Sequence, residues 1–343
     1  MRAVTKNFAA AGVMAVACAG CTTPITGGPA AMVVAQAQTQ PVGSANEDAA
    51  DDPAIWRNRA DPARSLVVAT DKKAALYVYD LDGTVRSFVA GGLLNNVDLV
   101  EREDGTVLVA ASDRGDITNS QIALYRLDTA SGELVLLGRV ASGPGEAYGL
   151  CLSTHGGQLS AFAVIKDGRV REYALSDDAV PTATQLREFS VPSQAEGCAA
   201  DPRSGAVYIG EEAGGIWRFA PGATTGEIVA AMDNDRLVAD VEGLTLAPVG
   251  EDGGWLVASS QGDNAYAVWL LDDWSFAGRF RIAEGTFGSA EETDGIALAL
   301  GDFGPDFPGG LFVAQDGMNV PEAQNFKLVA WETILAALAK GPE

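Results

Sequence analysis

The chain has 343 residues, of which 47% are hydrophobic and 40 are glycine, and this composition excludes disorder as a general description. Lys and Arg number 23 against 46 Asp and Glu, which gives a formal net charge of −23. Nucleic-acid phosphates require basic surfaces, so we expect no nucleic-acid partner. The charge suits either a solubilising surface or carboxylates that converge on divalent cations.

The N-terminus has the pattern of an export signal. Basic residues at Arg2 and Lys6 precede an apolar run from Phe8 to Gly20, which is too short to span a bilayer. We therefore interpret residues 1–20 as a signal peptide. The protein is expected to be periplasmic or an outer-membrane lipoprotein, and otherwise secreted.

Two ways of processing this signal stay open. The run ends in Cys18-Ala19-Gly20-Cys21, which resembles a bacterial lipoprotein cleavage box with Cys21 as the lipidated residue and a lipid anchor to the membrane. The alternative is soluble release after a site such as Ala35-Gln36-Ala37. Residues 21–50 are rich in Thr, Pro, Gln and Ala, and we expect a flexible tether there.

From residue 51 to the end at 343 we predict one all-β domain. Short runs of Val, Ala, Leu and Tyr recur between Gly, Asp and Asn turns, and helical periodicity begins only at Trp331. Each recurring unit has a polar start, an apolar strand that ends in a charged or amide turn, and a strand with aromatic residues. The polar starts lie 44, 52, 48, 46 and 52 residues apart, at Asp52, Asn96, Tyr148, Glu196, Glu242 and Asp294.

Six units of this period predict a six-bladed β-propeller with a central channel. A helical solenoid does not fit the period-2 strands. We expect the outermost strand of one blade to come from the segment before Asp51, which would close the ring. Cys151 and Cys198 lie in the folded part, and the sequence leaves open whether they form a disulfide or two buried thiols. We expect a monomer.

The innermost strand of every blade lines the channel, so the polar starts should point at one axis. The turns after the second strands add another layer, with Lys72, Lys73, Arg114, Lys166, Glu211, Glu212, Gln261 and Asp316. Several carboxylates around one axis repel one another unless a cation joins them. The donors are all oxygens, which favours calcium, in several ions, over zinc.

The basic and acidic turn residues separate along the chain. The cations come from the first three units and the later units supply acids and an amide. Such a channel mouth suits a polyanion that must be both held and attacked. Calcium-dependent lactonases with six-bladed propellers are an alternative, but a neutral lactone gives no reason for the cations. A non-catalytic calcium-binding propeller is another alternative.

In order along the chain, these residues resemble a known family, the β-propeller phytases, which are alkaline, calcium-dependent 3-phytases. The likeness covers residues 51–335, and its stretches include DDPAIW from Asp51, ATDKKAALYVYDLDG from Ala69, LNNVDL from Leu94, YGLCL from Tyr148, EGCAAD from Glu196, YIGEE from Tyr208, DVEGLT from Asp240, ASSQGDNAYA from Ala258, TDGIAL from Thr293 and LFVAQDG from Leu311.

The resemblance implies roles for matching positions. Calcium at the catalytic centre would be held by Glu196, Glu212, Asp240, Glu242, Gln261 and Asp294, with Tyr148 alongside. Phosphate would be bound by Lys72, Arg114 and Lys166, with Lys73 as the alternative to Lys72. Structural calcium would draw on Asp52, the Val97 carbonyl and Asp316. The implied reaction is hydrolysis of phytate, bound as its calcium complex, by metal-activated water.

Overall fold

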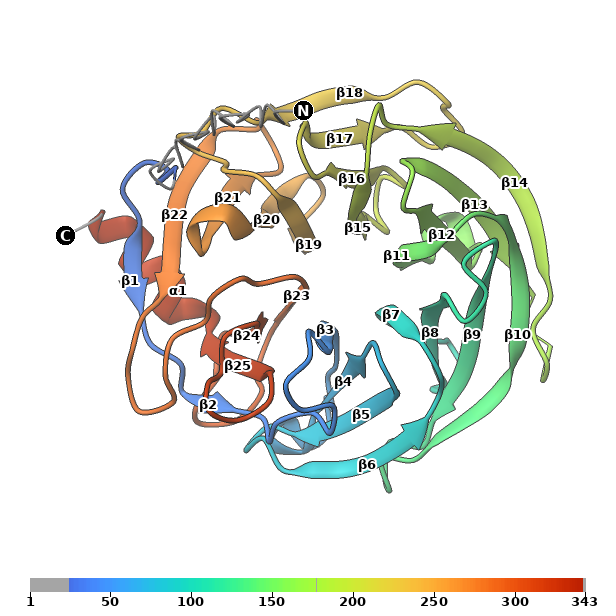
Figure 1. Cartoon of the computed structure of the whole chain (residues 1–343), viewed down its shortest axis with the longest axis horizontal. Coiled ribbons are helices and arrows are strands. Elements are labelled where there is room, and N and C mark those ends of the chain that lie inside the picture. Colours follow the sequence, from blue (N-terminus) through green and yellow to red (C-terminus); the bar gives the residue numbers. More distant parts are fainter. Residues whose placement is uncertain (1–24, 177, 342–343) are drawn as a thin grey trace, which may run out of the picture.

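The structure is a computed structural model that describes residues 25–176 and 178–341. The expected signal peptide and Cys21 lie outside the described residues. Within them, the strands form six sheets arranged around a central axis (Figure 1). The prediction of a six-bladed β-propeller is confirmed. Among these residues, no helix is both long and apolar enough to cross a membrane.

Each blade contains three or four consecutive antiparallel strands, which run outward from the axis in chain order. Blade 1 contains β3 (Ala50–Trp56), β4 (Leu66–Asp71), β5 (Ala75–Asp80) and β6 (Val85–Ala90). Blade 2 contains β7 (Leu94–Glu101), β8 (Val107–Asp113), β9 (Asn119–Leu127) and β10 (Leu134–Pro144). Blade 3 contains β11 (Ala147–Ser153), β12 (Ser160–Ile165), β13 (Arg169–Leu175) and β14 (Ala183–Ser190).

The remaining blades differ at their outer edges. Blade 4 contains β15 (Ala195–Ala200), β16 (Val207–Glu211), β17 (Gly215–Phe219) and β18 (Glu227–Ala231). Blade 5 contains β19 (Val241–Val249), β20 (Gly253–Ser260), β21 (Ala265–Leu270) and β22 (Phe276–Ile282), with β1 (Ala31–Val33) as a fifth strand parallel to β22. Blade 6 contains β23 (Ile296–Leu300), β24 (Gly310–Asp316) and β25 (Asn325–Ala330), and its outermost strand is β2 (Ala37–Gln38).

The hydrophobic core lies between neighbouring blades. Alternate residues of a strand point to opposite faces, so both faces of each sheet can pack against a neighbour. Val68 of blade 1 packs in one cluster with Val109 and Tyr125 of blade 2, and Phe162 of blade 3 packs with Phe219 of blade 4. The helix α1 (Trp331–Lys340) covers the outer edge beside β1 (Figure 1).

The segment before Asp51 closes the ring, as expected, but its described part is not a tether. Strand β2 pairs with β25, so the chain before blade 1 completes blade 6. Strand β1 buries Ala31 and Val33, with Ala35 just beyond it, in the core shared by blades 5 and 6. This alternation of buried residues has the period of a strand, and the polar Thr, Pro and Gln around it obscured the signal. The expectation of a flexible tether over 21–50 is therefore corrected for the described residues 25–50, where β1 and β2 pair with two blades.

Candidate active site

Antiparallel pairing brings two separate segments of each blade to the same end of the channel. The start of the innermost strand lies beside the end of the second strand; in blade 4, Ala195 is opposite Glu211. The residue after the second strand then bonds back to the first segment. Glu212 N donates to the Gln194 carbonyl at 3.0 Å, and Gln261 N donates to the Asp240 carbonyl at 3.0 Å in blade 5. The two polar layers seen in the sequence therefore meet at one channel mouth.

A β-bulge opens the start of the innermost strand in blades 1 to 5. The register shifts there, for example between Ala50 and Pro53 in blade 1 and between Ala195 and Cys198 in blade 4. A bulge interrupts the strict alternation of side chains, so a residue next to the expected one can also reach the channel. The glycines that follow allow neighbouring innermost strands to approach closely: a Cβ on Gly149 would overlap the Glu196 carbonyl.

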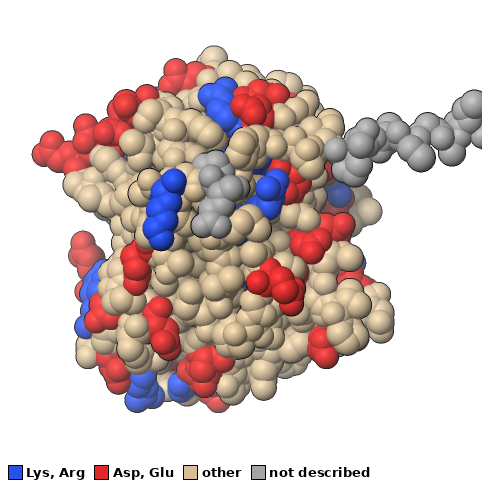
Figure 2. All heavy atoms as spheres, turned by 90° about the vertical axis from the view of Figure 1, so that its left-hand side faces the viewer, with Lys and Arg blue, Asp and Glu red and all other residues tan. Residues whose placement is uncertain are grey.

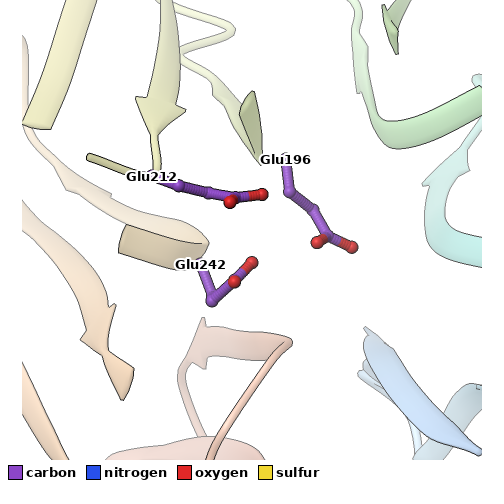
Figure 3. Close-up of side chains that lie close together, drawn as sticks. All are labelled: Glu196, Glu212 and Glu242. Carbon is purple, nitrogen blue, oxygen red and sulfur yellow. The ribbon is translucent and has the colours of Figure 1, made fainter. Parts of the chain in front are cut away.

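Three glutamates converge at this mouth (Figure 3). Glu196 comes from β15, Glu242 from β19, and Glu212 from the turn after β16. One carboxylate oxygen from each lies within 4.8 Å of the others. Glu196 and Glu242 are buried and Glu212 nearly so, with 4%, 6% and 8% of their surfaces exposed. The structure thus brings these three predicted residues together, and their roles stay predictions.

Burial and mutual repulsion make these carboxylates hard to ionise. Burial, followed by repulsion from Asp51 and Glu242, raises the pKa of Glu196 well above its usual value. Burial and then Asp294 raise the pKa of Glu242 in the same way. Burial also raises the pKa of Glu212. The Oε2 atom of Glu242 is buried and has no hydrogen-bond partner. A ligand that supplies positive charge would satisfy all three groups.

Lys72 is the internal counter-ion next to this cluster. Its ammonium contacts the carboxylates of Asp48, Asp51 and Asp294 at 2.9, 2.8 and 2.9 Å. Burial alone would lower the pKa of Lys72, but the three carboxylates outweigh burial and raise it. Of the two candidate lysines, Lys72 is buried here while Lys73 is exposed, and which of them binds phosphate stays a prediction.

Asp294 links Lys72 to the next blade. Gln261 Nε2 donates to Asp294 Oδ1 at 2.7 Å, so these two predicted ligands lie together. Burial raises the pKa of Asp294 to about 7, although Lys72 lowers it. Asp240 is half-buried and its charge acts on both Glu212 and Glu242.

Asp51 and Asn95 reach the site but were missing from the predicted set. Asn95 Nδ2 donates to Asp51 Oδ2 at 3.0 Å and to Glu196 Oε1 at 2.6 Å. Each belongs to a doublet, Asp51-Asp52 or Asn95-Asn96, and lies at a bulge. The doublets were the available signal, since strict strand alternation would send only one residue of each pair toward the channel.

The other predicted cations lie on the same side as Tyr148. The Lys166 ammonium is 4.8 Å from the centre of the Tyr148 ring. Burial and then Glu196 raise the pKa of Tyr148, so its hydroxyl stays protonated. Arg114 Nη1 is 3.8 Å from Glu146 Oε1, and both side chains are partly buried.

The predicted structural calcium ligands do not form one group. Val97 lies beside Asp52, because its backbone N donates to Asp52 Oδ2 at 3.0 Å. Asp316 Oδ2 is 3.1 Å from the ammonium of Lys327, which is 1% exposed and also donates to Gln38 and Asn319. A buried ammonium thus pairs with Asp316 here, and the assignment of Asp316 as a calcium ligand stays a prediction.

Cys151 and Cys198 form a disulfide with their Cα atoms 5.4 Å apart. This bond joins β11 and β15, the innermost strands of blades 3 and 4. It resolves the alternative that the sequence left open. The cross-link lies on the same strand as Glu196, two residues further along.

The fold and the site define a class: a propeller whose channel mouth combines buried carboxylates with a smaller number of cations. Comparison with known proteins agrees with this class and narrows it. The sequence profile of the phytase family matches residues 5–343. The chain is also 38% identical over 336 residues to the 3-phytase of Bacillus subtilis (strain 168), covering 91% of this chain and 86% of that protein. The chain belongs to the phytase family, and it is therefore a phosphoric monoester hydrolase.

Proposed function

We propose that this phytase hydrolyses phosphomonoesters of myo-inositol hexakisphosphate with water activated by calcium ions at the channel mouth. The observation that carries the proposal is the convergence of Glu196, Glu212 and Glu242 within 4.8 Å. Their donors are oxygens, their pKa values are raised, and one oxygen lacks a partner, which together fit a hard divalent cation.

The chain's own residues divide the work of this reaction. Glu196, Glu212 and Glu242 would hold the ions, with Asp240, Gln261 and Asp294 at the edge. Calcium, when bound, supplies a water of lowered pKa and charge that offsets the phosphate oxygens. Lys166 and Arg114 face the same mouth, where they hold phosphate groups and stabilise negative charge that develops during transfer. Tyr148 orients the Lys166 ammonium by a cation–π contact.

We further propose that the substrate is the calcium complex of phytate. The protein carries a net charge of −23 and would repel a bare polyanion at long range. The outer side that carries β1 and α1 shows more acidic than basic side chains (Figure 2). Calcium on the substrate reduces this repulsion. Initial rates measured while calcium and phytate vary independently test this step, and rates that follow metal-free phytate alone would contradict it.

The reaction is tested by phosphate release from phytate, with and without calcium, using matched neighbours on β16 and its turn. Glu212→Gln should lower kcat by about 10- to 100-fold, since loss of a group that holds or orients a metal ion typically costs this much. Glu211→Gln is the control: the Glu211 carboxylate accepts from Ser193 and Trp217 within blade 4 and faces away from the cluster. Full activity of the wild type in excess chelator would refute the calcium proposal.

We propose that the protein is exported and processed before Gly27. Gly27 N donates to Asp263 Oδ2 at 3.0 Å, and Gly28 N donates to the Asp235 carbonyl at 2.7 Å, so the fold uses the chain from this point. Cleavage after Ala37 would remove β1. The disulfide supports an oxidising compartment. Mass spectrometry of the purified protein's N-terminus tests this, and a start beyond Gly27 would refute it. Lipidation of Cys21 and a monomeric state stay predictions.

A further inference from the structure

Two similar side-chain hydrogen bonds join the segment before β15 to the end of β16. Ser193 Oγ donates to Glu211 Oε1 at 2.5 Å, and Gln194 Nε2 donates to Glu212 Oε1 at 2.7 Å. Consecutive residues on one segment thus hold consecutive glutamates on the other. Ser193 and Gln194 lie just before β15, and Glu212 lies just after β16.

The two glutamates differ in what else they contact. Glu211 also accepts from Trp217 Nε1 at 2.8 Å, so both of its oxygens are engaged inside blade 4. Glu212 is the member that joins Glu196 and Glu242 at the channel mouth (Figure 3). The Ser193–Glu211 bond therefore lies within blade 4, whereas the Gln194–Glu212 bond holds a residue of the candidate active site.

Gln194 is tied to Glu212 at two points. Its carbonyl accepts from Glu212 N at 3.0 Å, in addition to the side-chain bond at 2.7 Å. The backbone contact recurs in neighbouring blades, where Glu146 accepts from Lys166 N and Asp240 accepts from Gln261 N. The position occupied by Gln194 thus forms part of the rim of the mouth, between two acidic residues in blades 3 and 5.

The amide of Gln194 suits this position for a chemical reason. An amide NH₂ donates to a carboxylate without adding charge to a site already crowded with carboxylates. It engages Oε1 of Glu212 and so restricts rotation of the carboxylate, which leaves the other oxygen for the cluster. A carboxylate at position 194 would instead place like charges in contact, which disfavours the ionised form of both.

We propose that Gln194 is a positioning residue that fixes the carboxylate of Glu212 for cation binding. It does not itself contact the reacting phosphate. The inference rests on the proposed function of Glu212 as a calcium ligand. Groups that orient ligand carboxylates typically change metal affinity or activity by about 10- to 100-fold when lost.

The experiment compares Gln194→Met with Ser193→Ala in the full chain. Gln194→Met keeps a side chain of similar length but removes the donor. It should raise the calcium concentration for half-maximal activity by about tenfold or more and lower kcat at limiting calcium, with KM for phytate at saturating calcium unchanged. The Tm increase caused by calcium, measured without substrate, should require correspondingly more calcium. Ser193→Ala loses the matched bond and should keep the wild-type calcium requirement, whatever its effect on Tm.

The outcomes separate a positioning role from a structural one. If Gln194→Met has the wild-type calcium requirement in both assays, the proposal is wrong. Gln194→Asn, which is one methylene shorter and cannot reach Glu212 in the same way, should behave like Gln194→Met and provides a second variant if the first folds poorly. Full activity of Glu212→Gln would instead overturn the proposed function of the site, independently of Gln194.

Discussion

Asp294→Asn should stabilise the protein in the absence of calcium and should lose this advantage over the wild type in excess calcium. The Asp294 side chain is 15% exposed, and burial raises its pKa from an ordinary value of 3.8 to about 7 despite the contact with Lys72. Such a shift corresponds to on the order of 4 kcal/mol between the protonated and ionised forms. Asn resembles the protonated form in shape and charge.

The sign of the pH dependence follows from proton binding. Between pH 3.8 and about 7 the folded state binds the proton on Asp294 more tightly than the unfolded state does. This contribution to stability is fully present below pH 3.8 and is lost as the pH rises through about 7. Without calcium at pH 8, the free energy of unfolding of Asp294→Asn should therefore exceed that of the wild type by about 4 kcal/mol. At low pH the two proteins should have similar free energies of unfolding.

Thermal unfolding in chelator and in excess calcium measures this effect. Unfolding entropy near 2 cal/mol/K per residue makes 4 kcal/mol equivalent to about 6 °C in Tm for a chain of this size. Calcium should restore the advantage of the wild type, because an ionised ligand binds the cation and Asn offers only a neutral oxygen. If Asp294→Asn is no more stable than the wild type in chelator at pH 8, burial does not disfavour the ionised form of Asp294 and the reasoning is wrong.

Three further substitutions test other parts of the site. Lys72→Met should lower stability in chelator by about 3 to 5 kcal/mol, because buried carboxylates lose their counter-ion, whereas Lys73→Met, at an exposed neighbour, should not; equal Tm values for the two would refute the assignment. Lys166→Ala should raise KM for phytate by at least about tenfold in steady-state kinetics, and an unchanged KM would exclude phosphate binding there. Cys151→Ala and the double variant with Cys198→Ala should lose the same stability in denaturant unfolding, up to about 4 kcal/mol for a link across 47 residues; additive losses would indicate packing instead.

The fold could be predicted because the repeat itself carries the information. Polar starts at Asp52, Asn96 and Tyr148 recur at a period that only a ring of similar units explains. The same period predicted that Glu196, Glu212 and Glu242 lie near one axis, and in the structure their carboxylates lie within 4.8 Å of one another. What the repeat could not provide was detail that departs from it, such as β1, whose small apolar residues lie in a polar segment outside the repeated unit.

The site was predicted less completely because bulges and counter-ions are local. Asp51 and Asn95 enter the mouth through bulges, which no alternating pattern anticipates. The ion pair between Asp316 and Lys327 could not be predicted from the sequence either. The two residues lie on paired strands, and nothing in their spacing indicates that the lysine side chain is buried. Oxygen-rich clusters therefore need a count of nearby ammonium groups before calcium is assigned to them.

Lys72 connects these observations to catalysis. In the calcium-free protein its ammonium neutralises Asp48, Asp51 and Asp294, which no other described cation contacts. A calcium ion held by the neighbouring carboxylates would offset part of this negative charge, and the attraction between the Lys72 ammonium and these carboxylates would then weaken. We infer that Lys72 then becomes available to a substrate phosphate. The cation that pairs with these three carboxylates and the cation predicted to bind phosphate would thus be the same residue.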